Sequence, residues 1–373
     1  MSHIHIALVG NETYPVYSVI RFLNPDTIYL ICSDGPGGSI NEARTIVSNL
    51  KGEKDDIQIV TMDPANFEGI YKGIDSLQSN FTDGDYITLN ITGGTKFWAL
   101  AFYKTFCNRP DTQLFLFNQN NSLWNLLTNT CTDLQGLDLD TIISLYGNNT
   151  TSFTKLDSYT DKDDESMRKI ESARHFNPKA FVKLAAALDP NNSQSLRTNP
   201  SGIFSDSAGN TIMWSKPDQA VISFKNKGMT KTYRLDSPNA VSLLFNSGWF
   251  EYKVAKLLSG WEKVKEIRMN CIFPLNPNYP KNEVDIIVNT DIKPVFVECK
   301  TAVHTATDID KFATVVSNYG GAACKALFVT EKPMKDLPAT KCKESNIATF
   351  SLEGHSEGDL YSFLDFILME SNK

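Results

Sequence analysis

Short apolar runs alternate with amphipathic stretches along the first 120 residues of the chain. Five of these runs have the length of buried strands, at residues 3–9, 27–32, 57–60, 85–91 and 113–117. Helical periodicity follows each of the first four. Strict alternation of strand and helix is typical of a parallel sheet with helices on both faces. The pattern therefore predicts a Rossmann-like, doubly wound α/β domain over residues 1–147.

The alternation stops near residue 145. Residues 148–166 are polar, and we interpret them as a linker or an exposed connection. A helix is expected over residues 178–188, and short antiparallel strands over residues 199–236. This middle segment, residues 148–236, contains no motif that indicates a chemistry.

Residues 237–373 return to a mixed pattern. A helix is expected over residues 238–258, strands over 264–273, 283–288 and 293–300, a helix over 308–318 and a strand over 326–330. The order of one helix, three strands, one helix and one strand predicts a second α/β domain. A chain of 373 residues has room for two cores of this kind.

Composition narrows the function classes. The formal net charge is -7, so the whole protein lacks the basic footprint of a constitutive nucleic-acid binder. The seven cysteines are scattered without a CxxC pair, which disfavours a zinc site and suits a reducing cytoplasm. The start of the chain has the pattern of a strand, not of a signal peptide, and no apolar stretch has the length of a membrane span. We expect a cytoplasmic protein with no membrane contact.

Three residues near the C-terminus carry the strongest chemical signal. Asp285 lies in one expected strand, and Glu298 and Lys300 lie two residues apart in the next, on one face. Two carboxylates and an ammonium then meet on one side of a hairpin. Neighbouring carboxylates among apolar residues favour a divalent cation, Mg²⁺ or Mn²⁺, which can activate water and polarise a phosphodiester. The alternative is a structural salt bridge on a solvent-facing surface.

Glu251 lies in the helix that precedes these strands. A carboxylate there can reach the same cation from the side, although an exposed helical position would also accept a glutamate.

The segment resembles the PD-(D/E)xK nuclease superfamily. The resemblance rests on Val284-Asp285, the turn, and Val297-Glu298-Cys299-Lys300, with Val284 in place of the proline. It implies that Asp285 and Glu298 are metal ligands and that Lys300 is the catalytic lysine. It also implies the backbone carbonyl of Cys299 as a further metal ligand. Lys311, on the following helix, would contact substrate phosphate or remain a solvated surface lysine.

Unusual polar residues follow the expected strands of the first domain. Parallel doubly wound sheets bind ligands at the carboxyl ends of their strands. The richest loop there is Thr92-Gly93-Gly94-Thr95-Lys96, whose glycines, hydroxyls and charge suit a phosphate, and a helix begins behind it. It is neither a Walker loop nor a dinucleotide fingerprint. A simple helix cap with an exposed lysine is the plain alternative.

This run, with Asn90 and Ile91 before it, resembles the CARF domain, which senses cyclic oligoadenylates in type III CRISPR immunity. The resemblance implies a homodimer, because a cyclic tetranucleotide has two-fold symmetry and two identical pockets can each bind half of it. It implies ring-phosphate contacts from residues 92–96. Gly10 of a neighbouring loop is expected in the same ligand site, and ribose and adenine contacts are expected from Asn11, Glu12, Thr13, Asp34 and Asn118.

The two resemblances together imply one function. We expect a cyclic tetra-adenylate-activated, metal-dependent endonuclease that cuts single-stranded DNA or RNA in antiviral defence. Two alternatives stay open. One is a ring nuclease that degrades its own activator, and the other is a ligand-gated nucleic-acid-binding regulator.

Overall fold

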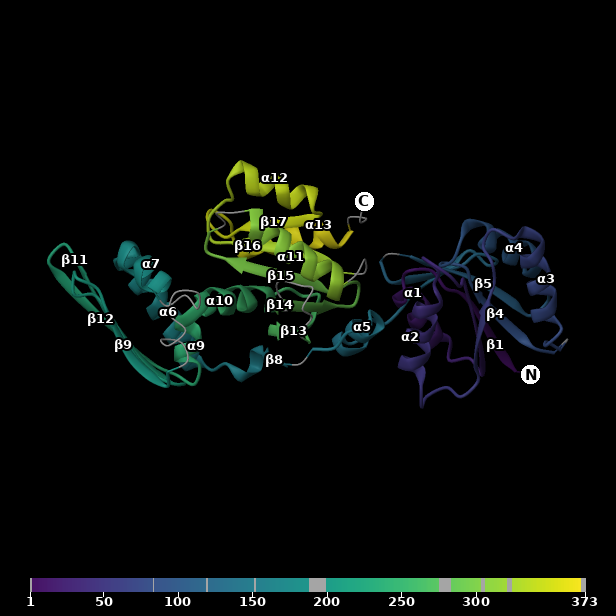
Figure 1. Cartoon of the computed structure of the whole chain (residues 1–373), viewed down its shortest axis with the longest axis horizontal. Coiled ribbons are helices and arrows are strands. Elements are labelled where there is room, and N and C mark those ends of the chain that lie inside the picture. The colour runs from purple at the N-terminus through teal and green to yellow at the C-terminus, as the bar shows by residue number, and fades with distance from the viewer. Residues whose placement is uncertain are drawn as a thin grey trace.

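The computed structural model of this chain describes residues 2–82, 84–118, 120–150, 152–187, 199–274, 283–302, 306–320 and 324–369. Within these ranges the strands form three sheets. Figure 1 shows the N-terminal sheet and the β9–β12 sheet at opposite ends of the molecule, with the C-terminal sheet between them. Every helix in the described ranges is too short or too polar to cross a membrane.

The N-terminal sheet has seven strands in the order β3-β2-β1-β4-β5-β6-β7. The strands are β1 (His3–Leu8), β2 (Thr27–Cys32), β3 (Ile57–Thr61), β4 (Tyr86–Asn90), β5 (Thr112–Asn118), β6 (Ser122–Asn125) and β7 (Thr130–Asp133). The first five are parallel, as the alternating pattern predicts. β6 and β7 add an antiparallel edge that the sequence does not predict.

Helices cover both faces of this sheet and complete two cores. One face packs against α1 (Tyr14–Leu23) and α2 (Ile40–Leu50). The other packs against α3 (Phe67–Gln78) and α4 (Lys96–Phe106). This two-faced arrangement confirms the predicted doubly wound α/β fold.

The polar stretch at residues 148–166, interpreted from the sequence as a linker or an exposed connection, contains a short strand and the start of a helix. Residues Ser152–Lys155 form β8, which pairs with β13 (Val264–Ile272) at the edge of the C-terminal sheet. Residues Asp161–Phe176 form α6, which begins with a capping box between Thr160 and Asp163. A polar sequence can form a helix when its first turn is capped and acidic, as it is here.

The middle sheet is antiparallel, in the order β12-β11-β10-β9, and its strands follow the expected region. They are β9 (Ser201–Ser205), β10 (Thr211–Ser215), β11 (Gln219–Asn226) and β12 (Met229–Asp236). Its inner face shares one core with α6 and α7 (Pro178–Ala187) and with the C-terminal domain. The middle segment is therefore packed structure. The boundaries at residues 147 and 236 remain predictions.

The C-terminal sheet has six strands in the order β17-β16-β15-β14-β13-β8. The strands not yet given are β14 (Glu283–Thr290), β15 (Val295–Lys300), β16 (Lys325–Thr330) and β17 (Ile347–Ser351). α11 (Ala306–Tyr319), α12 (Asp336–Glu344) and α13 (Glu357–Met369) accompany it, so the predicted second α/β domain is present.

One expected helix is interrupted. Residues 238–258 form α9 (Ala240–Leu244), the short helix η2 (Phe245–Ser247) and α10 (Gly248–Ser259). The break falls at Ser247, whose φ of 64° is left-handed and ends a right-handed helix. The break sets the position of α10, which carries Glu251.

Candidate functional site

The hairpin of β14 and β15 brings together the three residues singled out in the C-terminal domain. Ile286 pairs with Val297 in antiparallel register, which places Asp285 opposite Glu298. The Lys300 Nζ atom lies 2.7 Å from Glu298 Oε1 and 3.6 Å from Asp285 Oδ2. Asp285 and Glu298 are almost fully buried, and Lys300, whose side chain is 33% exposed, forms an ion pair with each of them.

The backbone of β15 takes part in the same cluster. Asp285 Oδ2 accepts a hydrogen bond from the Cys299 N–H group at 2.8 Å, and Lys300 Nζ donates to the Cys299 carbonyl at 3.3 Å. Burial alone would lower the pKa of Lys300, but the charges of Asp285 and Glu298 outweigh it and raise the pKa above its ordinary value. Lys300 therefore stays protonated and holds the cluster together.

Glu251 of α10 lines the same cavity, which has a volume of about 910 Å³. Burial, and then the negative charge of Asp285, raise the pKa of Glu251 well above its ordinary value. The cluster thus has more carboxylates than its one ammonium neutralises. A cation among them would relieve this repulsion.

The donor set has the chemistry of a hard divalent cation, which takes carboxylate and carbonyl oxygens. The predicted oxygen ligands are Glu251, Asp285, Glu298 and the Cys299 carbonyl, and they fit Mg²⁺ or Mn²⁺ in kind. In the described parts of the chain, however, no three His, Cys, Asp or Glu side chains converge tightly enough to enclose a metal ion. Lys300 Nζ lies within 3.6 Å of three of the predicted donors, which are Glu298, Asp285 and the Cys299 carbonyl.

The Cys299 thiol does not belong to this site. Its side chain is part of the hydrophobic core on the other face of the sheet, and burial raises the pKa of the thiol well above its ordinary value. Only the Cys299 carbonyl faces the cluster, in agreement with the alternation along a strand.

Three loops meet at the carboxyl ends of β1, β2 and β4 in the N-terminal domain. Ser39, which follows the loop that holds Asp34, donates its hydroxyl to the Val9 carbonyl at 2.8 Å. A Cβ atom on Gly93 would lie 2.2 Å from the Leu8 carbonyl oxygen, and one on Gly10 would lie 3.0 Å from the Gly94 amide nitrogen. Glycine is therefore required here because two loop backbones pack together. This packing explains the glycines without any ligand.

The residues of the loop at 92–96 differ in their contacts with the rest of the domain. The Thr92 hydroxyl donates to Asn90 Oδ1 at 2.6 Å and accepts from the Phe117 N–H group at 2.7 Å. Thr95 caps α4 by accepting from the Trp98 N–H group. Gly94, Thr95 and Lys96 are exposed, so the outer half of this loop is open to a ligand.

The residues of the loop after β1 differ in exposure and in what they contact. Asn11 is exposed, as are Asp34 and Asn118 on the neighbouring loops. Thr13 is 3% exposed, and its hydroxyl donates to the Leu145 carbonyl at 2.8 Å. The Glu12 carboxylate accepts from the Tyr146 hydroxyl at 3.0 Å. Glu12 and Thr13 thus contact the end of α5 (Leu139–Leu145), the helix that leads toward the C-terminal domain.

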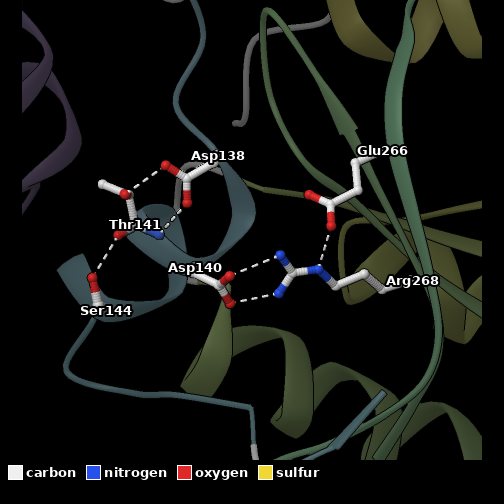
Figure 2. A network of polar contacts seen from close by, with 6 residues as sticks. All are labelled: Asp138, Asp140, Thr141, Ser144, Glu266 and Arg268. Carbon is white, nitrogen blue, oxygen red and sulfur yellow. Dashed lines mark hydrogen bonds and ion pairs between the residues drawn. The ribbon is translucent and has the colours of Figure 1, made fainter. Parts of the chain in front are cut away.

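Direct contacts join the N-terminal domain to the sheet that carries the acidic cluster. Asn121 Nδ2 donates a hydrogen bond at 2.7 Å to the carbonyl of Asp291, which lies in the turn between β14 and β15. Asn289 Nδ2 donates to the Leu137 carbonyl at 2.9 Å. Figure 2 shows a third contact, an ion pair between Arg268 of β13 and Asp140 of α5. The hairpin that carries the acidic cluster therefore rests on the N-terminal domain.

Sequence reasoning missed several residues of the large cavity. Tyr159, Lys216 and Asn270 line it together with the acidic cluster. They come from η1 (Leu156–Ser158) and its C-cap, from the turn between β10 and β11, and from β13. No local motif marks these positions.

The fold and the two sites define a Rossmann-like N-terminal domain joined to an α/β domain with a buried acidic hairpin. Residues 4–145 match the family model described as the Card1 CARF domain, and the N-terminal domain is accordingly a CARF domain. No curated protein sequence matches the chain.

Solved structures of the same fold extend over the whole chain. Can2 from Sulfobacillus thermosulfidooxidans, solved in complex with cyclic tetra-adenylate, aligns with a TM-score of 0.71 at 17% identity and covers 99% of this chain and 100% of its own. Protein VC1899 from Vibrio cholerae aligns with a TM-score of 0.72 at 15% identity, covering 99% of each chain. A type III CRISPR defence DNA nuclease activated by cyclic oligoadenylate aligns at 0.56 and 15% identity, over 95% of this chain and 49% of its own.

Proposed function

We propose that this protein is a PD-(D/E)xK nuclease that cyclic tetra-adenylate activates in type III CRISPR defence, and that it cuts single-stranded DNA or RNA. The observation that carries the proposal is the buried cluster of Asp285, Glu298 and Lys300 on one hairpin, in a cavity open to substrate. The CARF domain at the N-terminus supports a cyclic oligoadenylate as the activator. Two proteins of similar fold are named for binding such a ring or being activated by one.

The chemistry of the chain's own residues suits phosphodiester hydrolysis. Asp285, Glu298 and the Cys299 carbonyl would hold Mn²⁺ or Mg²⁺, with Glu251 as a fourth donor from α10. When bound, such an ion polarises the phosphodiester and lowers the pKa of coordinated water. Lys300, kept protonated by its carboxylate neighbours, would neutralise charge that develops on the phosphate.

The activator would occupy the loops at the carboxyl ends of the N-terminal strands. The exposed Thr95 and Lys96, with the backbone of Gly93 and Gly94, offer donors and a charge to the ring phosphates. Asn11, Asp34 and Asn118 are exposed around them and would contact ribose and adenine. Gly10 and Thr92 would shape the pocket, whereas Glu12 and Thr13 would transmit the signal through α5.

A homodimer would place two such pockets across a two-fold axis. The surface beside Lys96 supports this arrangement, because it is apolar and exposed. Phe67 of α3 and Leu100 of α4 are 59% and 67% exposed, and the rings of Phe67 and Phe97 lie 4.2 Å apart. A second copy that covered this face would remove apolar surface from water and bring two Lys96 loops together.

The experiment is a cleavage assay on labelled single-stranded DNA and single-stranded RNA with Mn²⁺, with and without cyclic tetra-adenylate. Cutting that requires the metal and that the ring strongly stimulates is expected, and Glu298→Ala should abolish it. Cutting by Glu298→Ala would refute the site. Cutting at the same rate with and without the ring would refute activation by the ring. Lys96→Ala should raise the ring concentration needed for half-maximal cutting, while Lys104→Ala, on the same helix, serves as the charge-matched control.

A further inference from the structure

One wall of the cavity that holds the acidic cluster comes from the middle segment. Lys216 and Pro217, in the turn between β10 and β11, line the cavity together with Glu251, Asp285 and Glu298. Tyr159, just before α6, lines it as well. The β9–β12 sheet therefore belongs to the surroundings of the candidate active site, although it lies outside the C-terminal sheet.

The wall is held firmly against the helices that shape the site. The Val241 N–H group donates to the Pro217 carbonyl at 3.2 Å, and the Ser237 N–H group donates to the Asp218 carbonyl at 3.0 Å. Trp214 of β10 packs edge-to-face on Phe245, with ring centroids 5.4 Å apart. The turn with Lys216 is thus fixed to α9 and, through it, to α10 with Glu251.

Charge around the cavity is arranged unevenly. Carboxylates dominate its lining, namely those of Glu251, Glu283, Asp285, Glu298 and Asp308. Lys300 forms ion pairs with Glu298 and Asp285 at the centre of the cluster. In the described part of the lining, the other two ammonium groups belong to Lys216, on the middle-segment wall, and Lys311, on α11. The two lysines thus come from separate elements of the lining.

Cations in the lining would favour the binding of a nucleic-acid strand at a site of this kind. Each phosphate carries a negative charge, and the carboxylates that hold a metal would repel the phosphates next to the scissile one. A lysine in the lining would compensate that repulsion and position the strand without reading its sequence. The acidic net charge of the protein makes such local cations the source of substrate affinity.

We propose that the β9–β12 sheet is the substrate-holding wall of this nuclease, and that Lys216 contacts a backbone phosphate next to the scissile phosphate, with Lys311 as its counterpart on α11. The inference rests on the proposed nuclease function. It assigns a role to the segment for which the sequence indicates none.

The test compares Lys216→Ala with Lys227→Ala, which removes the same charge from the exposed turn between β11 and β12. Both full-length variants would be assayed on a fluorescein-labelled oligodeoxythymidine with Mn²⁺ and cyclic tetra-adenylate. Loss of one charged contact should raise KM on the order of tenfold for Lys216→Ala, with kcat little changed. The salt dependence of kcat/KM should flatten by a slope of about 0.7. Lys227→Ala should match the wild type.

Equal KM values for the two variants would overturn the inference, as would a loss confined to kcat. Lys216→Arg keeps the charge, so it should restore KM, and a failure to do so would also count against a phosphate contact. The activity of the wild type distinguishes a failure of this inference from a failure of the proposed nuclease function. A wild type that does not cut under these conditions refutes the nuclease itself, whereas a wild type that cuts beside an unaffected Lys216→Ala refutes only the role of Lys216.

Discussion

Arg268 and Asp140 form a two-pronged ion pair between β13 and α5, with Arg268 Nη1 2.6 Å from Asp140 Oδ1 and Nη2 3.0 Å from Oδ2 (Figure 2). The Arg268 side chain is 5% exposed, and its Nε atom also contacts Glu266 at 2.6 Å. A nearly buried guanidinium with two carboxylate partners is a fixed point between the C-terminal sheet and the helix that ends the N-terminal domain.

Asp140→Ala should loosen this junction. Arg268 would keep Glu266 but lose two charge-assisted hydrogen bonds, and we expect a loss of about 1–2 kcal/mol in the free energy of unfolding. The exposure of Asp140 favours the lower value. Denaturant unfolding measures the stability, and Asp133→Ala, an exposed carboxylate on β7, is the control. A double-mutant cycle with Arg268→Met that shows no coupling would contradict the account.

Much of the site could be predicted because its signal is local. Asp285, Glu298 and Lys300 lie on one hairpin, and alternation along a strand fixes which side chains share a face. The parallel N-terminal sheet follows from five apolar runs separated by helical periodicity. In both cases, residues close in sequence determine the geometry.

The rest depends on contacts between distant segments. β8 is four residues long and mostly polar, and it forms a strand because it pairs with β13 at the edge of the C-terminal sheet. Lys216 and Tyr159 reach the cavity only through the packing of the β9–β12 sheet and α6. Gly93 suggests a ligand cradle in the sequence, yet the fold requires it for the contact with the Leu8 carbonyl.

Asn121 links the N-terminal domain to the hairpin of β14 and β15. Its side chain donates to the Leu134 carbonyl at 2.9 Å and to the Asp291 carbonyl at 2.7 Å. Asn121→Ala should leave ring binding and unstimulated cutting unchanged and lower ring-stimulated cutting on the order of tenfold, because couplings between sites are typically 1–3 kcal/mol. The ratio of stimulated to unstimulated rates is the measurement.

Asn129→Ala is the matched control for that variant. Asn129 has a φ of 54°, close to the 61° of Asn121, and it lies exposed in the turn between β6 and β7. Both substitutions place alanine in left-handed backbone, so their strain is similar. Equal stimulation ratios for the two variants would show that the hydrogen bond to Asp291 does not carry the signal.

His5 should make the stability of the N-terminal domain depend on pH. It is fully buried in β1, and burial, with a smaller effect of His3, lowers the pKa of its imidazole to about 3. The unfolded chain takes up a proton below about pH 6.5, whereas the folded state does not until near pH 3. Stability from His5 is therefore complete above pH 6.5 and is lost as the pH falls.

The expected loss between pH 7.5 and pH 5.5 is about 1.4 kcal/mol from this residue. Urea unfolding of the N-terminal domain at the two pH values measures it, and His5→Gln should show a smaller difference between them. The comparison concerns the change with pH, so it holds even if His5→Gln is less stable at both values. An identical pH difference in the two proteins would contradict a neutral, buried imidazole.

Lys300 contacts the oxygens proposed as metal ligands, because its Nζ atom contacts Glu298, lies 3.6 Å from Asp285 and donates to the Cys299 carbonyl. Lys300→Met should abolish cutting and at the same time bind Mn²⁺ more tightly, on the order of tenfold, because the ammonium no longer competes for the same oxygens. Isothermal titration with Mn²⁺ measures the affinity without any substrate. Lys311→Met, which removes a charge from α11, should leave it unchanged. Weaker Mn²⁺ binding in Lys300→Met than in the wild type would mean that the lysine helps to build the metal site and does not compete with the ion for it.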